Sequence, residues 1–583
     1  MGSIVKRQPK GCPRPVYSYH ETYRVKVAPG SEGKGPGSGK SKVKSRDVYL
    51  GTAEEVLKKC TEGLFPQEVD KREFGLVCAA LEVARELGIA EVIDEVVPKR
   101  RQGLTVGQYV LVGVLNKVCH PTSRSGIGEW FRRTVLPQKM GIDPDLLSGQ
   151  NFWDHFDLIV SEKEVKEKKA AVARGEVAER ELFSTDQVAK IEEGVWRRLL
   201  AKYNIVLDCV LYDTTNFYTF FSPTTDSFLA RTGHNKHGRH ELRQVGLALA
   251  VTRETQLPLF HVLYHGRKHD ARLFPEAMTD LVNRFLALAR GTGEITVVFD
   301  KGNNSPKNIE TARGLGVWVV GTLVPSHHPD LCGVRLKRYR ETVNGKPVFR
   351  TEKEVFGVRA LVVVVYNEAT YRRKKRRLRQ GVERLRDEVK EVFEKNKDCP
   401  KVEIEQKIRD LLKGSEYGRY LEVEVGGRRY KTLRCRINRK TYQQKLRTFG
   451  KTIIFTDNLA LSTKELVQQY TDRYQVEHAF RHFNDPDGIA FRPMYCWTDS
   501  KIRVYALICV LALLVLQLMN YRAAKAGLQM SNAVLKEELA DIHEVVLVFS
   551  LKRAERHLTK MSVIQQKLFE LFNLARYATA KST

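Results

Sequence analysis

The chain has 583 residues, of which 42% are hydrophobic and 29% charged. This composition is ordinary for a globular protein, and the length predicts two to four domains. Lys and Arg number 98 against 69 Asp and Glu, which gives a formal net charge of +29. Such a surplus repels itself in a compact state, so we expect a polyanionic partner, with nucleic acid as the first candidate. Charge alone does not separate an enzyme from a passive binding protein.

Three other classes of protein are disfavoured. The ten cysteines form no C-x-x-C pair, so a zinc finger is not indicated. The sequence starts with a polar, basic stretch and lacks a signal peptide, which favours free thiols in a reducing cytoplasm. Residues 504–516 are apolar, but the run is shorter than the roughly 20 residues of a membrane span, so we expect a buried core helix.

The first 202 residues contain one predicted hairpin and a helical region. Residues 16–27 and 42–50 alternate and are rich in β-formers, and a Gly/Ser/Lys-rich stretch at 29–41 separates them. We interpret them as a β-hairpin with a flexible basic tip, which is either a DNA-contacting arm or a plain surface loop. Residues 52–135 have apolar residues at helical spacing, and Thr105 is a candidate helix cap. We expect an all-helical DNA-binding and assembly region there.

From residue 203 the pattern changes to strands. An apolar run ends in Asp213, and residues 245–266 predict two strands around a turn. A helix is predicted at 271–290, followed by a short buried strand that ends in Asp300. Strands, a helix and a further strand in this order predict a mixed α/β layer.

Residues 301–463 are too long for one connection and must contain structure of their own. Strands are predicted at 317–324, 358–366, 420–426 and 451–456. A short coiled-coil-like seam has apolar residues at 4,3,4,3 spacing: Leu378, Val382, Leu385, Val389 and Val392. Residues 402–412 are its expected partner helix. Six consecutive basic residues precede the seam: Arg372, Arg373, Lys374, Lys375, Arg376 and Arg377. They form a solvated helix face or, as the charge of this chain favours, a DNA-phosphate contact.

Residues 464–583 are predicted to be helical throughout. A helix that starts at Ser462 or Thr463 places Tyr470, Arg473 and Glu477 at positions i, i+3 and i+7, so they share one face.

Three acidic residues suggest phosphodiester chemistry. Asp213 and Asp300 lie where strands are predicted to end, and ligand sites gather at strand ends. Two Mg²⁺ ions about 4 Å apart activate an attacking oxygen and stabilise a leaving oxygen, and Mg²⁺ needs only a few carboxylate ligands. Glu477 supplies the third carboxylate. Tyr470 and Arg473 are placed to hold a DNA phosphate near the ions.

Composition leaves competitors open, because any strand can end in Asp as a turn or cap residue. The competing acids are Asp208, Asp226 and Asp270. A histidine cluster with three-residue spacing is a second candidate metal site: His234, His237 and His240. Gly233 and Gly238 flank and interrupt this cluster, so a polar hairpin loop is the favoured interpretation.

Three segments carry a family resemblance: LYDTTNFYTF (211–220), VVFDKGNNSPKN (297–308) and YTDRYQVEHAFRHFN (470–484). In this order they resemble the insertion-sequence transposases of the DDE type. More narrowly, they are similar to the group with a β-strand-rich insertion and a Y-x2-R-x3-E-x6-K signature. The segment YLGTAEEVL (49–57) is similar to the N-terminal region of that group.

The resemblance implies that Asp213, Asp300 and Glu477 are the catalytic carboxylates and the ligands of two Mg²⁺ ions, for which Mn²⁺ can substitute. It also implies that Tyr470 and Arg473 contact DNA. The signature Lys is not matched, because this position is Asn484. We therefore expect a neighbour, such as Arg481, to supply the missing phosphate contact.

The implied fold is α/β, with a ribonuclease-H-like catalytic core, a β-rich insertion domain, and helical N-terminal DNA-binding and C-terminal regions. Six segments are expected. They are a basic N-terminal hairpin or arm (1–50), a helical DNA-binding and assembly region (51–202), the first part of the core (203–323), the insertion domain with a helical hairpin (324–463), the second part of the core (464–520) and a C-terminal helical region (521–583).

The implied function is cut-and-paste transposition, with metal-dependent cleavage at terminal inverted repeats and strand transfer to target DNA. A homodimer on double-stranded DNA is expected, in the cytoplasm of a bacterium or archaeon, associated with the nucleoid and without a membrane. Two alternatives stay open. One is a catalytically inactive DNA-binding derivative, for which Asn484 is the only sign. The other is a structure-selective nuclease with the same core, which would cut without joining.

Overall fold

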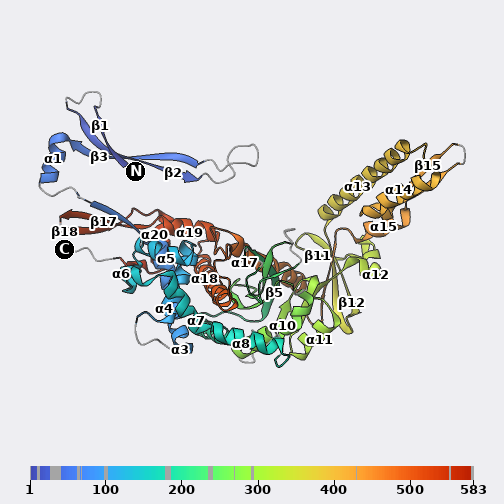
Figure 1. Ribbon diagram of the computed structural model, residues 1–583, viewed down its shortest axis with the longest axis horizontal. Coiled ribbons are helices and arrows are strands. Elements are labelled where there is room, and N and C mark those ends of the chain that lie inside the picture. The colour runs from blue at the N-terminus through green and yellow to red at the C-terminus, as the bar shows by residue number, and fades with distance from the viewer. Residues whose placement is uncertain are drawn as a thin grey trace. The chain divides into compact units, whose positions relative to one another are not determined.

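A computed structural model describes residues 2–8, 14–26, 41–61, 66, 68–97, 103–177, 186–222, 224–233, 241–267, 270–289, 295–427, 430–550 and 553–578. The described residues form a mixed α/β structure that divides into two compact units. Unit 1 consists of residues 1–79, 131–142 and 534–583, and unit 2 consists of residues 80–130 and 143–533. Figure 1 shows the elements with their labels.

Unit 1 begins with an antiparallel three-stranded sheet of order β1-β2-β3. Its strands are β1 (Gly2–Arg7), β2 (Val16–Lys26) and β3 (Ser41–Thr52), and α1 (Ala53–Thr61) follows. The hairpin predicted at 16–27 and 42–50 is confirmed, whereas β1 was not predicted. Residues 29–40 of the predicted basic tip lie outside the described residues.

A second sheet of unit 1 corrects two predictions of helix. Its order is β18-β17-β4, all antiparallel, with β4 (Glu68–Glu73), β17 (His543–Ser550) and β18 (Arg553–Leu558). The predictions of helix throughout 52–135 and 464–583 are therefore wrong at these strands. The β-branched run in β17 (HEVVLVFS) favours a strand, and the polar β4 (EVDKRE) is extended because its backbone pairs with β17.

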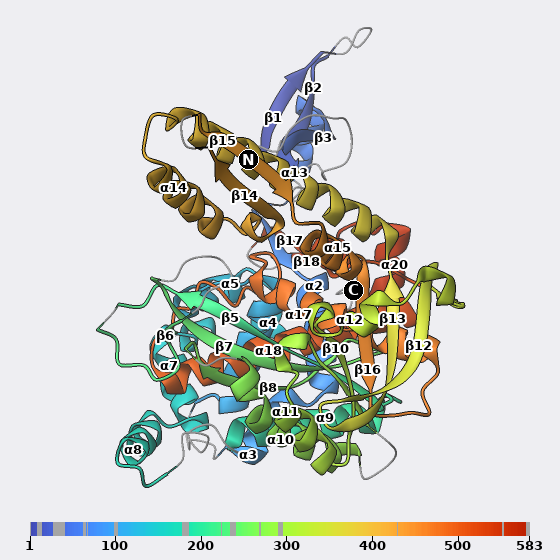
Figure 2. The ribbon, with the colours of Figure 1, turned by 90° about the vertical axis from the view of Figure 1, so that its right-hand side faces the viewer.

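The core of unit 2 is a sheet of ten strands within the described residues. Its order is β11-β12-β13-β16-β10-β9-β5-β7-β6, and β8 also pairs with β7. Strands β5, β9 and β10 run parallel, and the other neighbours are antiparallel. The bounds are β5 (Cys209–Thr219), β6 (Arg231–Thr232), β7 (Arg243–Thr252), β8 (Pro258–His265), β9 (Thr296–Val298), β10 (Trp318–Leu323), β11 (Glu341–Val343), β12 (Lys346–Val355), β13 (Val358–Tyr366) and β16 (Lys451–Thr456). Figure 2 shows β12, β13, β16 and β10 side by side.

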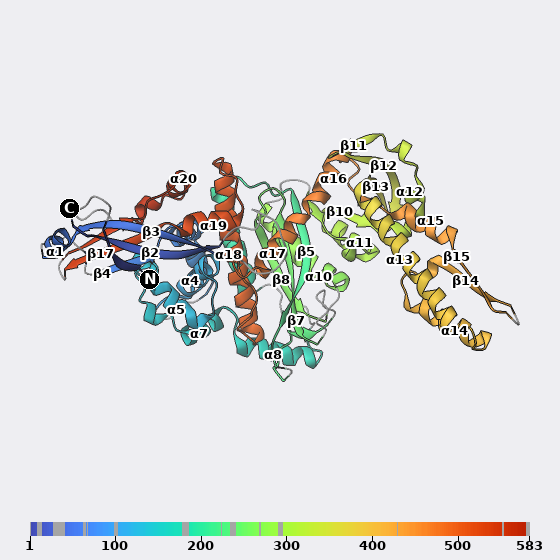
Figure 3. The same ribbon diagram turned by 90° about the horizontal axis from the view of Figure 1, so that it is seen from above.

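Helices cover both faces of this sheet beside β5. On one face, α10 (Asp270–Ala289) packs Met278 and Phe285 against Val210 and Tyr212. On the other face, the Phe217 ring lies 4.3 Å from the Phe491 ring. Because successive side chains of a strand point to opposite faces, Asp213 shares the face of Phe217. Figure 3 shows α17 and α18 on one side of these strands and α10 on the other.

Helix α18 (Asp499–Lys525) is the long apolar element of unit 2. It packs on α4 (Val106–Cys119), α7 (Gly149–Ile159), α9 (Gln187–Lys202) and β8. It is long and apolar enough to cross a membrane by length and composition, but its most apolar 18-residue window is 100% buried inside the protein. The buried core helix predicted around residues 504–516 is confirmed, and Thr105 caps α4 as expected.

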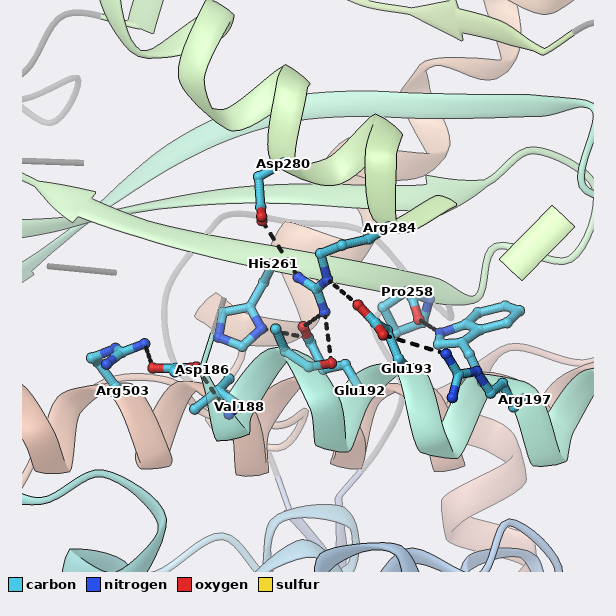
Figure 4. Close-up of polar contacts among 12 residues, drawn as sticks. Asp186, Val188, Glu192, Glu193, Arg197, Pro258, His261, Asp280, Arg284 and Arg503 are labelled. Atoms are coloured by element: carbon cyan, nitrogen blue, oxygen red, sulfur yellow. Dashed lines mark hydrogen bonds and ion pairs between the residues drawn. The ribbon is translucent and has the colours of Figure 1, made fainter. Parts of the chain in front are cut away.

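A buried ionic network joins α9 and α10 to β8 (Figure 4). Glu192 of α9 is 2% exposed; its carboxylate lies 2.6 Å from His261 Nδ1 and accepts a 2.7 Å hydrogen bond from Arg284. Arg284 also contacts Glu193 at 3.3 Å and Asp280 at 3.7 Å. A buried carboxylate is costly unless it is paired, and this pairing holds the two helices against the sheet edge.

A helical hairpin with a two-stranded sheet lies between β13 and β16 in the chain. It consists of α13 (Glu368–Lys395), α14 (Lys401–Gly414), β14 (Leu421–Gly426), β15 (Thr432–Ile437) and α15 (Arg439–Thr448). The predicted seam on α13 and its partner helix are confirmed with one correction. Phe393 is buried at the end of the seam, whereas Val392 is only partly buried. An α-helix has 3.6 residues per turn, so a strict 3.5-residue repeat drifts around it.

The remaining α-helices are α2 (Gly75–Glu86), α3 (Ile89–Val96), α5 (Arg124–Arg132), α6 (Leu136–Met140), α8 (Glu162–Ala173), α11 (Pro306–Gly314), α12 (Pro329–Gly333), α16 (Thr463–Asp472), α17 (Tyr474–Asn484), α19 (Asn532–Ala540) and α20 (Val563–Leu571).

Candidate active site

Asp213 lies on β5, and Asp300 lies just after β9, the parallel strand next to β5. Asp213 is in the middle of β5 and not at its end, because the segment after it continues to pair with β7 as far as Thr219. Asp300 follows β9 by two residues. Leu211 is in register with Val298, so each Asp lies two residues beyond a paired position. Strands about 4.8 Å apart therefore place both carboxylates at the same level of the sheet.

Glu477 is presented by α17. Ser462 caps the preceding α16 with a capping box that includes Glu465, which confirms the predicted helix start. The single helix expected across this segment is instead two, because the helix is interrupted at Arg473. Arg473 keeps helical dihedral angles (φ −50°, ψ −28°), so Tyr470 lies about one turn before it and Glu477 about one turn after it.

The three predicted carboxylates converge on the guanidinium of Arg473. Its nitrogens lie 3.6 Å from Asp213 Oδ2, 4.0 Å from Asp300 Oδ1 and 3.1 Å from Glu477 Oε1. The Arg473 side chain is only 16% exposed, whereas Glu477 is 47% exposed. Burial opposes the charge of Arg473, but Tyr470 and the three carboxylates outweigh it and raise the pKa of the guanidinium. The structure thus brings together residues from β5, the end of β9 and α17.

Tyr470 lies next to this cluster. Its hydroxyl is 3.3 Å from Thr322 Oγ1 on β10, and its ring centre is 5.7 Å from the Arg473 guanidinium. Arg253 in the turn after β7 contacts Asp472 at 2.7 Å and so ties α16 to the sheet. The last turn of α16, directly before Arg473, is therefore tied to the sheet by two contacts.

Three carboxylates face one positive group here, and carboxylate oxygens are the type of ligand that hard divalent cations prefer. In the described residues no three His, Cys, Asp or Glu side chains are gathered closely enough to hold a metal ion. At this site Arg473 lies between the carboxylates and provides the positive charge.

The competing acids lie elsewhere. Asp208 precedes β5 and is exposed, at the opposite end of the apolar run from Asp213. Asp226 is 83% exposed and pairs with Lys169 at 3.3 Å. The side chain of Asp270 is outside the described residues, as is the whole histidine cluster at 234–240.

A comparison with protein families decides the identity. The family described as "Transposase DDE domain" matches residues 208–513, more than half of the chain. The chain belongs to the DDE transposase family. The matched region runs from the start of β5 into α18 and contains all three carboxylates.

Comparisons with individual proteins add the following. No curated protein matches this transposase. Among solved structures, the piggyBac transposase in a synaptic complex with hairpin DNA is similar over 82% of this chain and 82% of that chain, at 10% identity and a TM-score of 0.36.

The predicted DNA-binding residues of the transposase lie in two places. Arg481 is exposed on α17, and Asn484 is the last residue of that helix. All six basic residues at 372–377 are exposed on the first turns of α13, although Arg372 pairs with Glu368 at 2.6 Å. The structure does not place this basic run among the three carboxylates, so any role in DNA binding is separate from the cluster.

One residue near Asn484 was not predicted. Arg492 donates a 2.7 Å hydrogen bond to Asn484 Oδ1, and its guanidinium lies 4.1 Å from the centre of the Tyr218 ring. It lies in the connection between α17 and α18, where no periodic pattern marks it. The only signal in the sequence was its position shortly after the Glu477 helix.

Proposed function

We propose that this transposase cleaves DNA at the terminal inverted repeats of its own element and joins the freed 3′-OH to target DNA. The observation that carries the proposal is the convergence of Asp213, Asp300 and Glu477 on one guanidinium. Acids on two parallel strands and a separate helix meet at one point in a strongly basic protein. Such a cluster suits a reaction on a phosphodiester, where cations must neutralise charge.

We propose that β8, β7, β5, β9 and β10 are the ribonuclease-H-like core, together with α10, α11 and α17. The sheet order and the three parallel strands support this assignment. Residues 324–463 separate β10 from α16 and contain β11 to β16, as expected of an insertion domain that divides the core. Residues 1–50, 51–202 and 521–583 remain the proposed arm, DNA-binding region and C-terminal region.

Asp213, Asp300 and Glu477 would hold two Mg²⁺ ions, for which Mn²⁺ can substitute. When bound, the ions increase the nucleophilicity of an attacking oxygen and stabilise the leaving oxygen. Asp213 has the central position, since its side chain is 17% exposed against 37% for Asp300 and 47% for Glu477. The carboxylates are thus graded from the sheet outward to solvent, on the side from which DNA must approach.

Arg473 has a second role in this proposal. Its guanidinium stabilises the carboxylates while they lack other cations, and its planar donors suit a phosphate oxygen equally well. Tyr470 supports it from the side, with its ring centre 5.7 Å from the guanidinium and its hydroxyl 3.3 Å from Thr322 Oγ1. We infer that Arg473 turns from the carboxylates to the scissile strand when DNA and cations are bound.

The proposed partners are double-stranded DNA at the terminal repeats and at the target, bound by a homodimer. The net charge of +29 and the exposed basic turns of α13 support DNA as the partner. The proposed location is the cytoplasm of a bacterium or archaeon, at the nucleoid.

The test uses the full-length protein and a duplex that ends in the inverted repeats found in the DNA flanking the gene. With Mg²⁺ the natural chain should cleave this duplex and join it to a plasmid, and Asp213→Asn should reduce cleavage by more than roughly 100-fold while DNA binding persists. Asp226→Asn is the matched control, because Asp226 is exposed and outside the cluster.

The alternatives give different results in the same assay. Binding without cleavage by the natural chain indicates an inactive derivative. Cleavage without joining indicates a structure-selective nuclease. Full strand transfer by Asp213→Asn contradicts the assignment of the carboxylates.

A further inference from the structure

Arg492 is a cation fixed in place without a carboxylate partner among the described residues. Its Nη2 donates to Asn484 Oδ1 at 2.7 Å, and its guanidinium lies 4.1 Å from the Tyr218 ring centre. Its Nε is buried and has no hydrogen-bond partner in the part of the chain that the structure describes. An arginine offers five N–H donors, so most of its hydrogen-bonding capacity and its full charge remain unused.

The backbone before Arg492 is held firmly. The amide of Phe491 donates to the Phe483 carbonyl at 2.7 Å, and the Phe491 ring is buried against Phe217. Lys117 of α4 donates to the Ala490 carbonyl at 3.0 Å. The backbone next to Arg492 is therefore fixed, and Asn484 and Tyr218 hold its guanidinium as well. A preorganised arginine loses little conformational entropy when it binds an anion.

The position of Arg492 relative to the carboxylates follows from α17. Asn484 is seven residues after Glu477, so both lie on the same face of the helix, about 10 Å apart along its axis. The Arg492 guanidinium is within hydrogen-bonding distance of Asn484. Arg492 therefore lies on the Glu477 side of α17, near the carboxylates.

From this geometry we infer that Arg492 binds a phosphate of the DNA strand that reacts at the carboxylates. Asn484 and Tyr218 are its positioning residues: the amide orients the guanidinium, and the ring supports its face through a cation–π contact. The inference rests on the proposed function, since it takes the carboxylate cluster as the place of reaction. It assigns the phosphate contact to Arg492 rather than to Arg481.

A purely structural role for Arg492 predicts a different outcome for one variant. Asn484→Asp places a carboxylate beside Arg492 and strengthens their contact, so a residue that only fixes the connection after α17 would be unaffected or stabilised. A phosphate contact would be weakened, because the new carboxylate competes for the guanidinium and repels DNA. Asn484→Asp thus separates the two roles even if Arg492→Ala fails to fold.

The experiment measures the dissociation constant of the full-length protein for the terminal-repeat duplex and for a scrambled duplex as a function of KCl. Arg492→Ala should reduce the slope of log K against log salt by about one on both duplexes. Asn484→Asp should also reduce this slope, without lowering the melting temperature. Arg359→Ala, an exposed arginine paired with Glu352 at 2.6 Å and outside the proposed DNA-binding region, is the control for the loss of one charge and should leave the slope unchanged.

A second arm replaces single phosphates near the cleavage site by neutral methylphosphonates. The natural chain should lose about tenfold in affinity when one particular phosphate near that site is modified, whereas Arg492→Ala should lose no further affinity at that same position. Equal losses for both proteins at every position, or a natural salt slope in both Arg492→Ala and Asn484→Asp, overturn the inference. If the natural chain neither prefers nor cleaves the repeat duplex, the proposed function fails instead, and the salt slopes on the scrambled duplex still decide whether Arg492 binds phosphate.

Discussion

Two arginines of unit 2 are each surrounded by three carboxylates, but the two clusters differ in packing. Arg284 is 6% exposed and contacts Glu192, which is 2% exposed, at 2.7 Å. Arg473 is 16% exposed, and its contacts to Asp213, Asp300 and Glu477 range from 3.1 to 4.0 Å. The carboxylates around Arg473 include one that is nearly half exposed, whereas the Glu192 carboxylate is closed off by two helices and a strand.

The difference indicates which cluster can exchange its cation. Around Arg284 the short contacts, the bond to the Ala189 carbonyl and the Phe260 ring 4.0 Å away leave the guanidinium no alternative position. Around Arg473 the contacts are 3.1 to 4.0 Å long and open to solvent on one side, as the proposed exchange of the arginine for other cations requires. The same residue types therefore form a structural pair in one place and a candidate catalytic site in the other.

The largest expected effect comes from changing one acid in each cluster. Asp300→Asn should reduce DNA cleavage by more than roughly 100-fold, because it removes one proposed cation ligand from the open cluster, the three carboxylates around Arg473. Asp280→Asn, around Arg284, should leave cleavage within about twofold of the natural rate, since it alters no residue near the carboxylates of the site. Gel assays on the repeat duplex measure both. Similar activity in the two variants would remove the distinction between the clusters.

Replacing each arginine should rank the two clusters the other way, because stability should fall most at the cluster around Arg284. Arg284→Met leaves the buried Glu192 with His261 as its remaining partner and should lower the free energy of unfolding by about 3–5 kcal/mol. Arg473→Met should lower it by about 1 kcal/mol or less, because water reaches the carboxylates that remain. Urea unfolding compares the two variants with the natural chain. A larger loss in Arg473→Met would mean that the open cluster is the structural one.

Low pH should destabilise the closed cluster, Arg284 and its three carboxylates, by protonating Glu192. Burial raises the pKa of this carboxyl, but His261 and Arg284 outweigh burial and lower the pKa in the folded protein. The unfolded value is about 4.3, so the stabilisation is complete above about pH 4.3 and is lost as pH falls through the lower folded value. The stability gap between the natural chain and Glu192→Gln should narrow below about pH 4 in urea titrations. A difference in stability that grows as the pH falls would contradict the lowered pKa of Glu192.

The smallest effect concerns cation binding at the open cluster. Millimolar Mn²⁺ should raise the melting temperature of the natural chain by about 2 °C, since a ligand that binds the folded state stabilises it. Asp213→Asn should abolish this shift and Glu193→Gln should retain it, because Glu193 belongs to the cluster around Arg284. Scanning fluorimetry with Mn²⁺ and with K⁺ of equal ionic strength provides the measurement. An identical shift in all three proteins would place the binding elsewhere.

Much of the fold could be predicted where the pattern is local. The strands at 358–366 and 451–456 are continuous apolar runs, and their ends agree with β13 and β16. The strands β4, β12 and β15 could not be predicted, because their sequences (EVDKRE, KPVFRTEKEV and TLRCRI) are polar and extended only through their pairing. Pairing partners such as β17 for β4 are hundreds of residues away, and no periodicity reports them.

The three acids of the candidate site and Arg473 were singled out from the sequence, and Arg492 was not. Asp213 and Asp300 follow apolar runs, and the family resemblance selected them over Asp208. The convergence of the carboxylates on Arg473 required the register of β5 with β9. Arg492 was missed because Tyr218, which supports it, is contributed by a distant strand.

The burial of α18 has a consequence for synthesis on the ribosome. Helix α4 is buried on nearly all sides, and α18, which it packs against, begins at Asp499. At 5 to 20 residues per second, roughly 20 to 80 seconds pass between the emergence of the two helices. During that interval the face of α4 that packs on α18 is uncovered, so nascent chains shorter than about 525 residues should bind chaperones and resist release.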